Sequence, residues 1–461
     1  MGRRVFVSVL GTGFYGECKY CTDSFTSSNT RFIQQATIEY LNVKNSWTES
    51  DCIYIVLTKK AKETNWENEQ ENRINPSTKQ EERYIRLKEI LSEMELPCSI
   101  RIIDIPDGRD ETEMWTIFHR LFDVVEPNDE LFFDLTHSFR YLPMLVLVLG
   151  NYARFLRDTK VRHISYGNYE ARNVETNLAP LMDVLPLATL QSWTFAAADL
   201  IQNGNARQLK ELSGENALTP MLRQKNKDNL SRKIASADLG KTINKLNEIM
   251  LEFQLCKGKE ILSGESISSF RSLVEDMLEP GYDAVLSVLP PIIERINDSL
   301  NVFEEDSLAN GFHAARWCFE HQLYQQSLTI LNENLTTAFC RLLGVDEKDY
   351  PIRECASKSL AKGSINLNDR NDWTRDPRRQ DANGDGETRF NKAKCMVQNR
   401  VDCNDPIVFS FLRYFHNDYY WLKGRRNSYN HASMTNYPFR EEDLPRLKKI
   451  IAKCLNYKYR Q

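Results

Sequence analysis

The chain has 461 residues, of which 41% are hydrophobic and 27% are charged, and its formal net charge at pH 7 is −4. This composition is typical of a soluble chain with two or three domains, each with its own core, and it excludes a disordered or fibrous protein. The small negative charge gives no general attraction for phosphate. Any contact with nucleic acid must therefore come from local basic segments such as "WLKGRR" or "RLKKIIAK".

Three features of the sequence favour a cytoplasmic location. The apolar runs are too short to cross a bilayer, and the opening "MGRRVFVSVLGTG" lacks the cleavage pattern of a signal peptide and looks like a first strand. The 11 cysteines, an odd number, suit a reducing compartment in which free thiols pack in the core. We therefore expect a cytoplasmic protein that has no disulfide framework and no membrane partner.

The first third of the chain alternates short apolar runs with helical patterns. Predicted strands lie at 5–10, 52–58, 98–106, 130–137 and 161–167. Predicted helices lie at 29–42, 83–94, 110–125 and 141–156, and a polar stretch occupies 62–80. Buried strands that alternate with helices indicate parallel pairing. Residues 1–185 are therefore predicted to form a doubly wound, Rossmann-like α/β domain with a parallel-rich sheet.

The pattern changes after residue 185. Segments such as "LATLQSWTFAAADLIQNG" and "QLYQQSLTILNENLTTAFCRLLG" have helical spacing and almost no strand signal. Residues 186–461 are therefore predicted to form an all-α region. A polar segment at 362–394, rich in Asp, Asn and Arg, is predicted to be an exposed loop or insertion in that region.

Two loops at the predicted carboxyl edge of the sheet carry candidate ligand-binding residues. In an open parallel sheet, ligands bind beyond this edge, where loops offer free backbone N–H groups. "LGTGFYG" follows the first strand and "DLTHSFR" follows the fourth, so the candidates are Gly11, Thr12, Gly13, Phe14, Tyr15, Asp134, Thr136, His137, Ser138 and Arg140.

Two alternatives bear on these loops. The glycine pair lacks the third glycine of a dinucleotide fingerprint, and no acidic residue ends the second strand, so a nicotinamide enzyme is disfavoured. The second alternative is structural: Asp134 or Thr136 caps the following helix, and Arg140 lies on the surface. The clustering of polar residues at one edge favours a ligand.

The residues Asp134, Thr136 and Arg140 match the pattern D-x-[ST]-x-x-x-[RK]. This pattern resembles that of the CARF domain, the Rossmann-like sensor of CRISPR-associated proteins, although Ser138 stands where many members have glycine. The glycine-rich first loop, Thr58 at the end of the second strand with Ala61 and Trp66 beyond it, and "WCFEHQLYQQSLTILNENL" extend the similarity along nearly the whole chain. The sequence resembles the CARF-HEPN ribonucleases of type III CRISPR systems.

The second signature of that family, R-x-x-x-x-H with Asn after Arg, stands here as "RNSYNH", with Arg426, Asn427 and His431. Cleavage of RNA through its own 2′-hydroxyl needs a proton acceptor, a proton donor and a fixed cation. Histidine and arginine supply these roles without a metal ion. One histidine is few for two proton steps, and the resemblance implies a composite site in a homodimer. The aromatic residues before the motif, Tyr419, Tyr420 and Trp421, are candidates for stacking on bases.

Three other motifs are less favourable. "RWCFEH" also contains the spacing, with Arg316 and His321, but its apolar helical pattern favours a core or surface role. "CKYC" has the spacing of half a zinc site, yet no second pair follows at a suitable distance. "DANGDG" copies the first half of a calcium loop, but Lys392 stands at the twelfth position in place of glutamate. We therefore expect no metal site.

The resemblance implies a homodimer, or a higher assembly of dimers, that binds cyclic oligoadenylate in its α/β domain and then cuts single-stranded RNA. Tetra-adenylate is favoured over hexa-adenylate, and the expected products carry a 2′,3′-cyclic phosphate and a 5′-hydroxyl. One ring is expected per dimer, across a twofold axis. Arg140 and Lys59 or Lys60 would neutralise its phosphates, and Thr12, Thr136 and the backbone N–H groups of Gly11 to Gly13 would donate hydrogen bonds to them. Thr58 is also expected at this ligand site, and Asp134 would cap the helix or orient Arg140 and His137.

Two rival functions stay open from the sequence. The first is a nucleotide-sensing regulator or adaptor whose helical domain binds RNA or protein without cutting, against which the intact "RNSYNH" motif argues. The second is a sensor that also slowly degrades its ring activator, for which Thr12, Thr136 and His137 would be the natural residues.

Overall fold

The computed structural model describes residues 2–67, 72–76, 78–137, 141–214, 229–278, 289–363, 393–399, 405–431 and 439–459. Within 229–278, side chains are described from Asp238 onward. The chain divides into two compact units, one built mainly from residues up to Ser192 and the other mainly from Trp193 onward. Most of the segment predicted as a polar loop at 362–394, including "DANGDG", lies outside the described residues.

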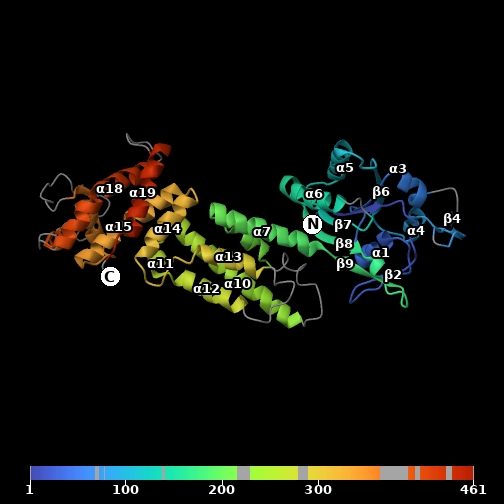
Figure 1. Ribbon diagram of the computed structural model, residues 1–461, viewed down its shortest axis with the longest axis horizontal. Helices are drawn as coiled ribbons and strands as arrows, with labels where there is room; N and C mark the ends of the chain where they lie inside the picture. Colours follow the sequence, from blue (N-terminus) through green and yellow to red (C-terminus); the bar gives the residue numbers. More distant parts are fainter. Residues whose placement is uncertain are drawn as a thin grey trace. The chain divides into compact units, whose positions relative to one another are not determined.

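A sheet forms the centre of the first unit (Figure 1). It has seven strands in the order β2-β9-β8-β7-β1-β3-β6. Its strands are β1 Arg4–Leu10, β2 Lys19–Cys21, β3 Cys52–Leu57, β6 Ser99–Asp104, β7 Glu130–Asp134, β8 Lys160–Gly167 and β9 Leu178–Asp183. All neighbours pair in parallel except β8 and β9. The predicted parallel-rich α/β fold is confirmed, and β2 and β9 are additions that the sequence pattern did not predict.

The alternation of side chains along β1 explains the three layers of this unit. Val5, Val7 and Val9 lie in one apolar core with helices α5 and α6, whereas Phe6 and Leu10 lie in a second core on the opposite face, with α1 and α4. A strand buried on both faces reads as a continuous apolar run, as "VFVSVL" does. The helices are α1 Ile33–Tyr40, α2 Val43–Ser46, α4 Leu87–Glu93, α5 Glu111–Asp123 and α6 Leu142–Arg157.

The polar stretch after β3 has a structure of its own. It begins with helix α3 (Lys59–Ala61) and the π-helical turn η1 (Lys62–Trp66). A two-stranded antiparallel hairpin follows, formed by β4 (Asn72–Ile74) and β5 (Glu81–Arg83). These polar strands carry no apolar alternation, which is why the sequence pattern did not reveal them.

The second unit is helical, as the sequence predicted, and no strand occurs in its described residues. Its helices are α7 Leu185–Asn203, which begins in the first unit, α8 Arg207–Leu212, α10 Asn229–Gln254, α11 Gly258–Ser263, α12 Glu265–Leu278, α13 Pro290–Ser299, α14 Ala309–Glu320, α15 Tyr324–Leu343, α16 Tyr350–Lys362, α18 Pro406–Asn430 and α19 Leu444–Asn456. No helix in the described part of the chain combines the length and the apolar character that crossing a bilayer requires.

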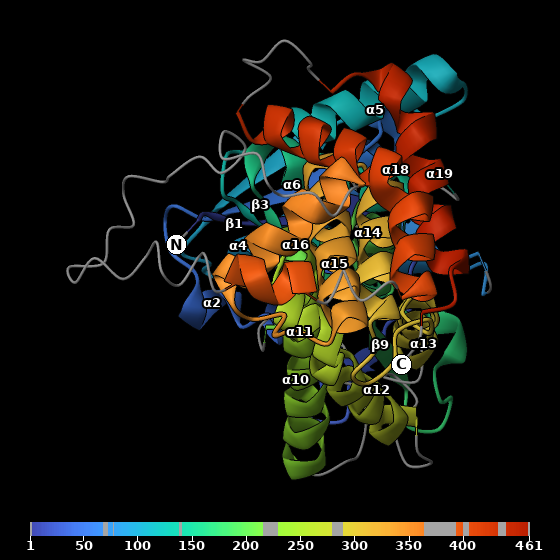
Figure 2. The same ribbon diagram turned by 90° about the vertical axis from the view of Figure 1, so that its left-hand side faces the viewer.

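Helix α15 lies at the centre of the C-terminal helices, against α14, α16 and α18 (Figure 2). Leu328, Leu331, Leu335 and Phe339 recur at helical spacing along it and are fully buried. Phe339 stacks on Phe411 of α18, with 5.6 Å between ring centroids. This packing fixes α18 alongside α15, and α18 carries the "RNSYNH" motif at its carboxyl end.

Candidate functional site

Three loops of the first unit meet at the carboxyl ends of adjacent strands. Residues 11–15 follow β1, residues 58–59 follow β3 and residues 135–137 follow β7, and β1 lies between the other two strands in the sheet. A Cβ placed on Gly11 would lie 3.5 Å from the Cβ of His137, so the first and third loops are in contact. The structure thus brings the described candidates to one edge, whereas Ser138 and Arg140 lie outside the described residues.

Two residues that the sequence analysis missed hold the first loop. Asn65, which is fully buried, donates from Nδ2 to the carbonyl oxygens of Gly11 at 2.7 Å and Gly13 at 2.9 Å. Arg73 donates to the carbonyl oxygens of Gly13 and Thr12, both at 3.0 Å, and to Asn65 Oδ1 at 2.7 Å.

These bonds determine where the backbone donors of the loop point. In a trans peptide the C=O and the following N–H point in opposite directions. The N–H groups of Thr12, Gly13 and Phe14 therefore point away from the Asn65 and Arg73 side chains that bind the carbonyls. Successive N–H groups with a common direction form a concavity that suits an anion.

Tyr15 folds back over its own loop. Its ring stacks on His137, with 4.0 Å between the ring centroids and 17° between the planes. Its Oη lies 2.5 Å from the position of a Cβ on Gly11, so only glycine fits there without displacing the tyrosine. The backbone groups of Gly11 and Gly13 hydrogen-bond this hydroxyl, and burial raises the pKa of Tyr15. The Tyr15 hydroxyl thus hydrogen-bonds backbone groups that the sequence analysis expected to bind phosphate.

Asp134 is buried and ties three strands together. Its Oδ2 accepts from the Ser8 hydroxyl of β1 at 2.6 Å, and its Oδ1 accepts from the backbone N–H and the hydroxyl of Thr136 at 3.2 and 2.6 Å. The Thr136 oxygen in turn accepts from the N–H of Gly167 on β8 at 2.8 Å. Burial raises the pKa of Asp134, and the hydrogen bonds from Ser8 and Thr136 oppose that effect.

This arrangement changes the expected roles of two residues. Asp134 bonds Ser8 and Thr136, so among the described residues its partners are strand and loop groups rather than the expected helix. Thr136 donates its single hydroxyl proton to Asp134 and so has none left for the phosphate that it was expected to bind. Thr12 and Lys59 are exposed, whereas Thr58 is buried and caps α3 through a hydrogen bond from the Ala61 N–H at 3.2 Å.

His137 completes this edge. Burial lowers its pKa to about 4, so the imidazole is neutral near pH 7. Its Nε2 is buried and has no hydrogen-bond partner among the described residues. A neutral imidazole has one N–H donor and one bare nitrogen, so it can recognise a base edge or a hydroxyl but does not supply positive charge to a phosphate.

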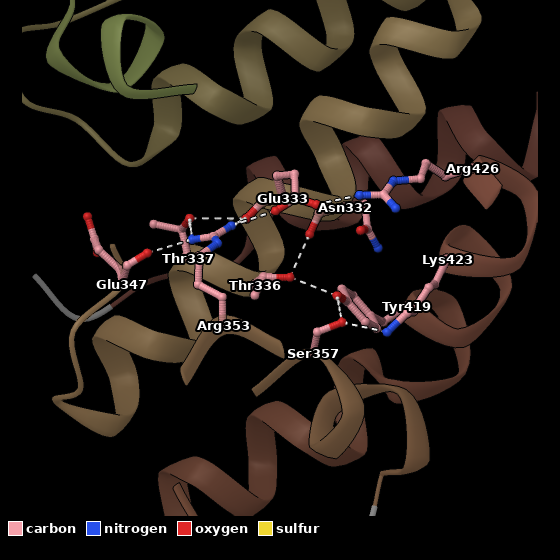
Figure 3. Close-up of polar contacts among 10 residues, drawn as sticks. All are labelled: Asn332, Glu333, Thr336, Thr337, Glu347, Arg353, Ser357, Tyr419, Lys423 and Arg426. Carbon is pink, nitrogen blue, oxygen red and sulfur yellow. Dashed lines mark hydrogen bonds and ion pairs between the residues drawn. The ribbon is translucent and has the colours of Figure 1, made fainter. Parts of the chain in front are cut away.

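The "RNSYNH" motif lies at the carboxyl end of α18. Arg426 Nη2 forms an ion pair with Glu333 Oε1 at 2.6 Å (Figure 3). Arg426 Nη1 donates to Asn427 Oδ1 at 3.0 Å. His431 ends the helix, and its N–H contacts the carbonyl oxygens of Asn427 and Ser428 at 3.1 and 3.2 Å. The side chain of His431 is exposed. The guanidinium is thus anchored by Glu333 and Asn427, whereas the imidazole is exposed.

A buried polar chain lies beside this motif. Thr336 contacts the Tyr419 hydroxyl at 2.7 Å, Tyr419 donates to Ser357 at 2.8 Å, and Lys423 Nζ donates to the same Ser357 oxygen at 2.8 Å. Burial raises the pKa of Tyr419 to about 12 and lowers the pKa of Lys423. The predicted stacking role of Tyr419 is therefore wrong, because its ring is fully buried, whereas Tyr420 remains 71% exposed.

Two of the less favoured motifs also have structural surroundings. His321, at the end of α14, stacks on Trp317, and its ring nitrogens lie 2.7 and 2.9 Å from the carbonyl oxygens of Trp317 and Ile201. These contacts agree with a core role. The "CKYC" segment forms β2, with Cys18 buried before it and Cys21 partly buried at its end. Within the described ranges, no three His, Cys, Asp or Glu side chains gather as metal ligands.

Comparisons with known proteins identify the N-terminal domain. Residues 5–170 match the family model described as the CARF domain of the CRISPR system endoribonuclease Csx1. The CRISPR-associated protein MJ1674 of Methanocaldococcus jannaschii is 22% identical over 262 residues, which are 56% of this chain but only 37% of that relative. Csm6 of Enterococcus italicus, solved bound to cyclic hexa-2'-fluoro-hexa-dAMP, aligns at 12% identity and a TM-score of 0.30, over 91% of this chain and 100% of that one. Residues 5–170 therefore form a CARF domain, and the comparisons support the resemblance to CARF-containing CRISPR-associated proteins that the sequence indicated.

Proposed function

We propose that this chain is an RNA endonuclease of type III CRISPR defence that cyclic oligoadenylate activates, with a HEPN-type helical domain as the cutting part. One observation carries the proposal: a chain with a CARF domain also contains "RNSYNH" at a helix end, with Arg426 anchored by Glu333 and His431 exposed. A sensor domain joined to a pair of groups suited to phosphate chemistry favours a ligand-controlled enzyme.

The chemistry follows from the two side chains. The 2′-hydroxyl of RNA attacks its own phosphorus, a histidine accepts the hydroxyl proton, and a second histidine protonates the departing 5′-oxygen. Arg426 stabilises the charge that grows on the phosphoryl oxygens. The products are a 2′,3′-cyclic phosphate and a 5′-hydroxyl, and no metal ion takes part. Because each chain supplies one His431, two chains related by a twofold axis supply both proton carriers.

The activator site lies at the CARF edge described above. The N–H groups of Thr12 and Phe14 share a direction that suits a phosphate, that of Gly13 becomes open to it once the Tyr15 hydroxyl leaves, and Lys59 is exposed nearby in the loop after β3. A ring of repeated nucleotides offers equal halves to two identical edges, so one ring per dimer is proposed, with tetra-adenylate favoured over hexa-adenylate. The ring activates the enzyme by binding the active arrangement of two chains more tightly than the idle one.

The test is an RNA-cleavage assay. Labelled single-stranded RNA is incubated with the purified protein, with and without cyclic tetra- or hexa-adenylate, in buffer with EDTA. We expect cleavage only with a ring present, unaffected by EDTA, and calorimetry should give half a ring per chain. Ring binding without cleavage would favour a nucleotide-sensing regulator or adaptor that does not cut RNA. Strict dependence of cleavage on a metal ion would contradict the mechanism in which histidine and arginine act alone. Loss of the ring over time, followed by chromatography, would identify the sensor that degrades its activator.

A further inference from the structure

Glu333 is a carboxylate that joins the proposed catalytic arginine to a second arginine. Its Oε1 accepts from Arg426 Nη2 of α18 at 2.6 Å, and its Oε2 accepts from Arg353 Nη2 of α16 at 2.7 Å (Figure 3). Glu333 itself belongs to α15. One side chain therefore links three helices at the point where the "RNSYNH" motif ends α18.

Arg353 keeps this carboxylate in place. Besides the ion pair, it donates to the backbone carbonyl oxygens of Glu333 at 3.1 Å and Glu347 at 3.0 Å, and to the Thr337 hydroxyl at 2.8 Å. A guanidinium with four acceptors in a fixed fork cannot easily rotate, so it fixes the carboxylate that it contacts. Glu333 is 44% exposed at its side chain, and without Arg353 it would be free to sample other rotamers.

The donors of Arg426 are only partly used by these contacts. Nη2 gives one N–H to Glu333 and Nη1 gives one to the Asn427 side chain. Each terminal nitrogen of a guanidinium has two N–H groups, so one remains on each. A phosphate can be gripped by two such N–H groups at once. The contacts with Glu333 and Asn427 therefore fix the fork while leaving one donor on each terminal nitrogen.

The negative charge of Glu333 also offsets the positive charges of nearby arginine and lysine side chains. Lys423 lies one helical turn before Arg426, partly withdrawn from water, and the positive charge of Arg426 contributes to the lowering of its pKa after burial. Arg353 and Arg426 both contact this carboxylate (Figure 3), and its negative charge acts to raise the pKa of Lys423. Removing the negative charge would leave these cations to repel one another, and the long Arg426 side chain would move toward water.

We propose that Glu333, held by Arg353, is a positioning residue that presents Arg426 to the scissile phosphate of RNA. The inference rests on the proposed function, because it concerns the same cutting site. Glu333 does not touch the reacting atoms and takes no proton. Its contribution is to place a flexible cation in the geometry that the transition state needs, where a displacement of about 1 Å lowers the rate about 100-fold.

The experiment compares Glu333→Ala and Glu333→Gln with wild type in single-turnover RNA cleavage at saturating cyclic oligoadenylate. Glu347→Gln is the matched control, because Glu347 pairs with Arg341 and has no contact with Arg426 among those described. We expect Glu333→Ala to lower the rate about 10- to 100-fold. Glu333→Gln should lower it less, because the amide oxygen still accepts a hydrogen bond, and Glu347→Gln should cleave at the wild-type rate.

A rescue measurement separates positioning from a role in folding. Millimolar guanidinium is added to Arg426→Ala, where it can bind between Glu333 and the phosphate and restore part of the cleavage. We expect the rescue to disappear in Arg426→Ala with Glu333→Gln, although both proteins have the same melting temperature and bind the ring equally. A carboxylate that only stabilised the fold would not change the rescue.

Three results would overturn the proposal. The first is cleavage by Glu333→Ala within twofold of the wild-type rate. The second is cleavage of RNA by Glu333→Ala without the ring, which would mean that Glu333 restrains Arg426. The third is rescue by guanidinium that persists in the double variant. Failure of the proposed function looks different. In that case wild type does not cut RNA, or Arg426→Ala cuts as well as wild type.

Discussion

The two candidate sites satisfy their polar groups in different ways. At the CARF edge, Asp134 and Asn65 are buried and bond to strands and loops that belong to the fold itself. At the end of α18, Arg426 forms an ion pair that is partly open to water and His431 is exposed. Substitutions at the CARF edge should therefore change stability or ring affinity, whereas substitutions at the end of α18 should change cleavage with the fold intact.

The largest expected effect is at the end of α18. Arg426→Ala and His431→Ala should each lower cleavage about 1,000-fold or more, because each removes a group that acts on the transition state. Ring binding and the melting temperature should stay at wild-type values. His321→Ala is the control and should keep most of the cleavage. If His321→Ala lost cleavage while His431→Ala kept it, our assignment of the cutting site to "RNSYNH" would be wrong.

The next effect tests the CARF edge as part of the fold. Asp134→Ala leaves the Ser8 hydroxyl and the N–H and hydroxyl of Thr136 without their acceptor, which should cost about 4 kcal/mol of unfolding free energy. Asp134→Asn should cost less, because an amide oxygen can still accept from Thr136. Hydrogen exchange of the sheet amides measures both. A stable Asp134→Ala protein that no longer binds the ring would make Asp134 a ligand contact.

A smaller effect is expected from pH. The folded-state pKa of His137 is lowered to about 4 by burial, so the folded domain favours the neutral ring. Its contribution to stability is complete above the unfolded pKa of about 6.5 and declines as pH falls toward 4, by no more than about 3 kcal/mol. His137→Gln should flatten this part of the stability curve, measured by denaturant unfolding. His431→Gln, at an exposed position, is the control, and an equal change in both variants would contradict the assignment to His137.

The smallest effect concerns the first loop. Asn65→Ala removes the hydrogen bonds to the carbonyl oxygens of Gly11 and Gly13, so the loop no longer presents its N–H groups in one direction. We expect ring affinity to fall about tenfold, equal to about 1.4 kcal/mol, with cleavage unchanged once the ring saturates. Calorimetry measures the affinity. Asn45→Ala is the control, because Asn45 is exposed and its side chain bonds only to Asn42 among the described residues. This variant should have the ring affinity of wild type.

Much of the fold could be predicted because it depends on local patterns. The strands β1, β3, β6, β7 and β8 are short apolar runs, and α5, α15 and α18 have helical spacing, so the parallel sheet and the helical second unit follow from the sequence. The short polar strands β2, β4 and β5 have no such pattern. Their pairing depends on partners elsewhere in the chain, such as β9 for β2.

The candidate site residues show the same division. A motif search finds Asp134, Thr136, Arg426 and His431, because their spacing is local, and their functional roles stay predictions. It does not find Asn65 or Glu333, which contact Gly11 and Arg426 across 54 and 93 residues of sequence. The sequence by itself determined the fold class, the CARF signature and the motif at the end of α18. Only the tertiary structure decided which side chains hold them, because a hydrogen bond depends on distance and direction in space rather than on separation along the chain.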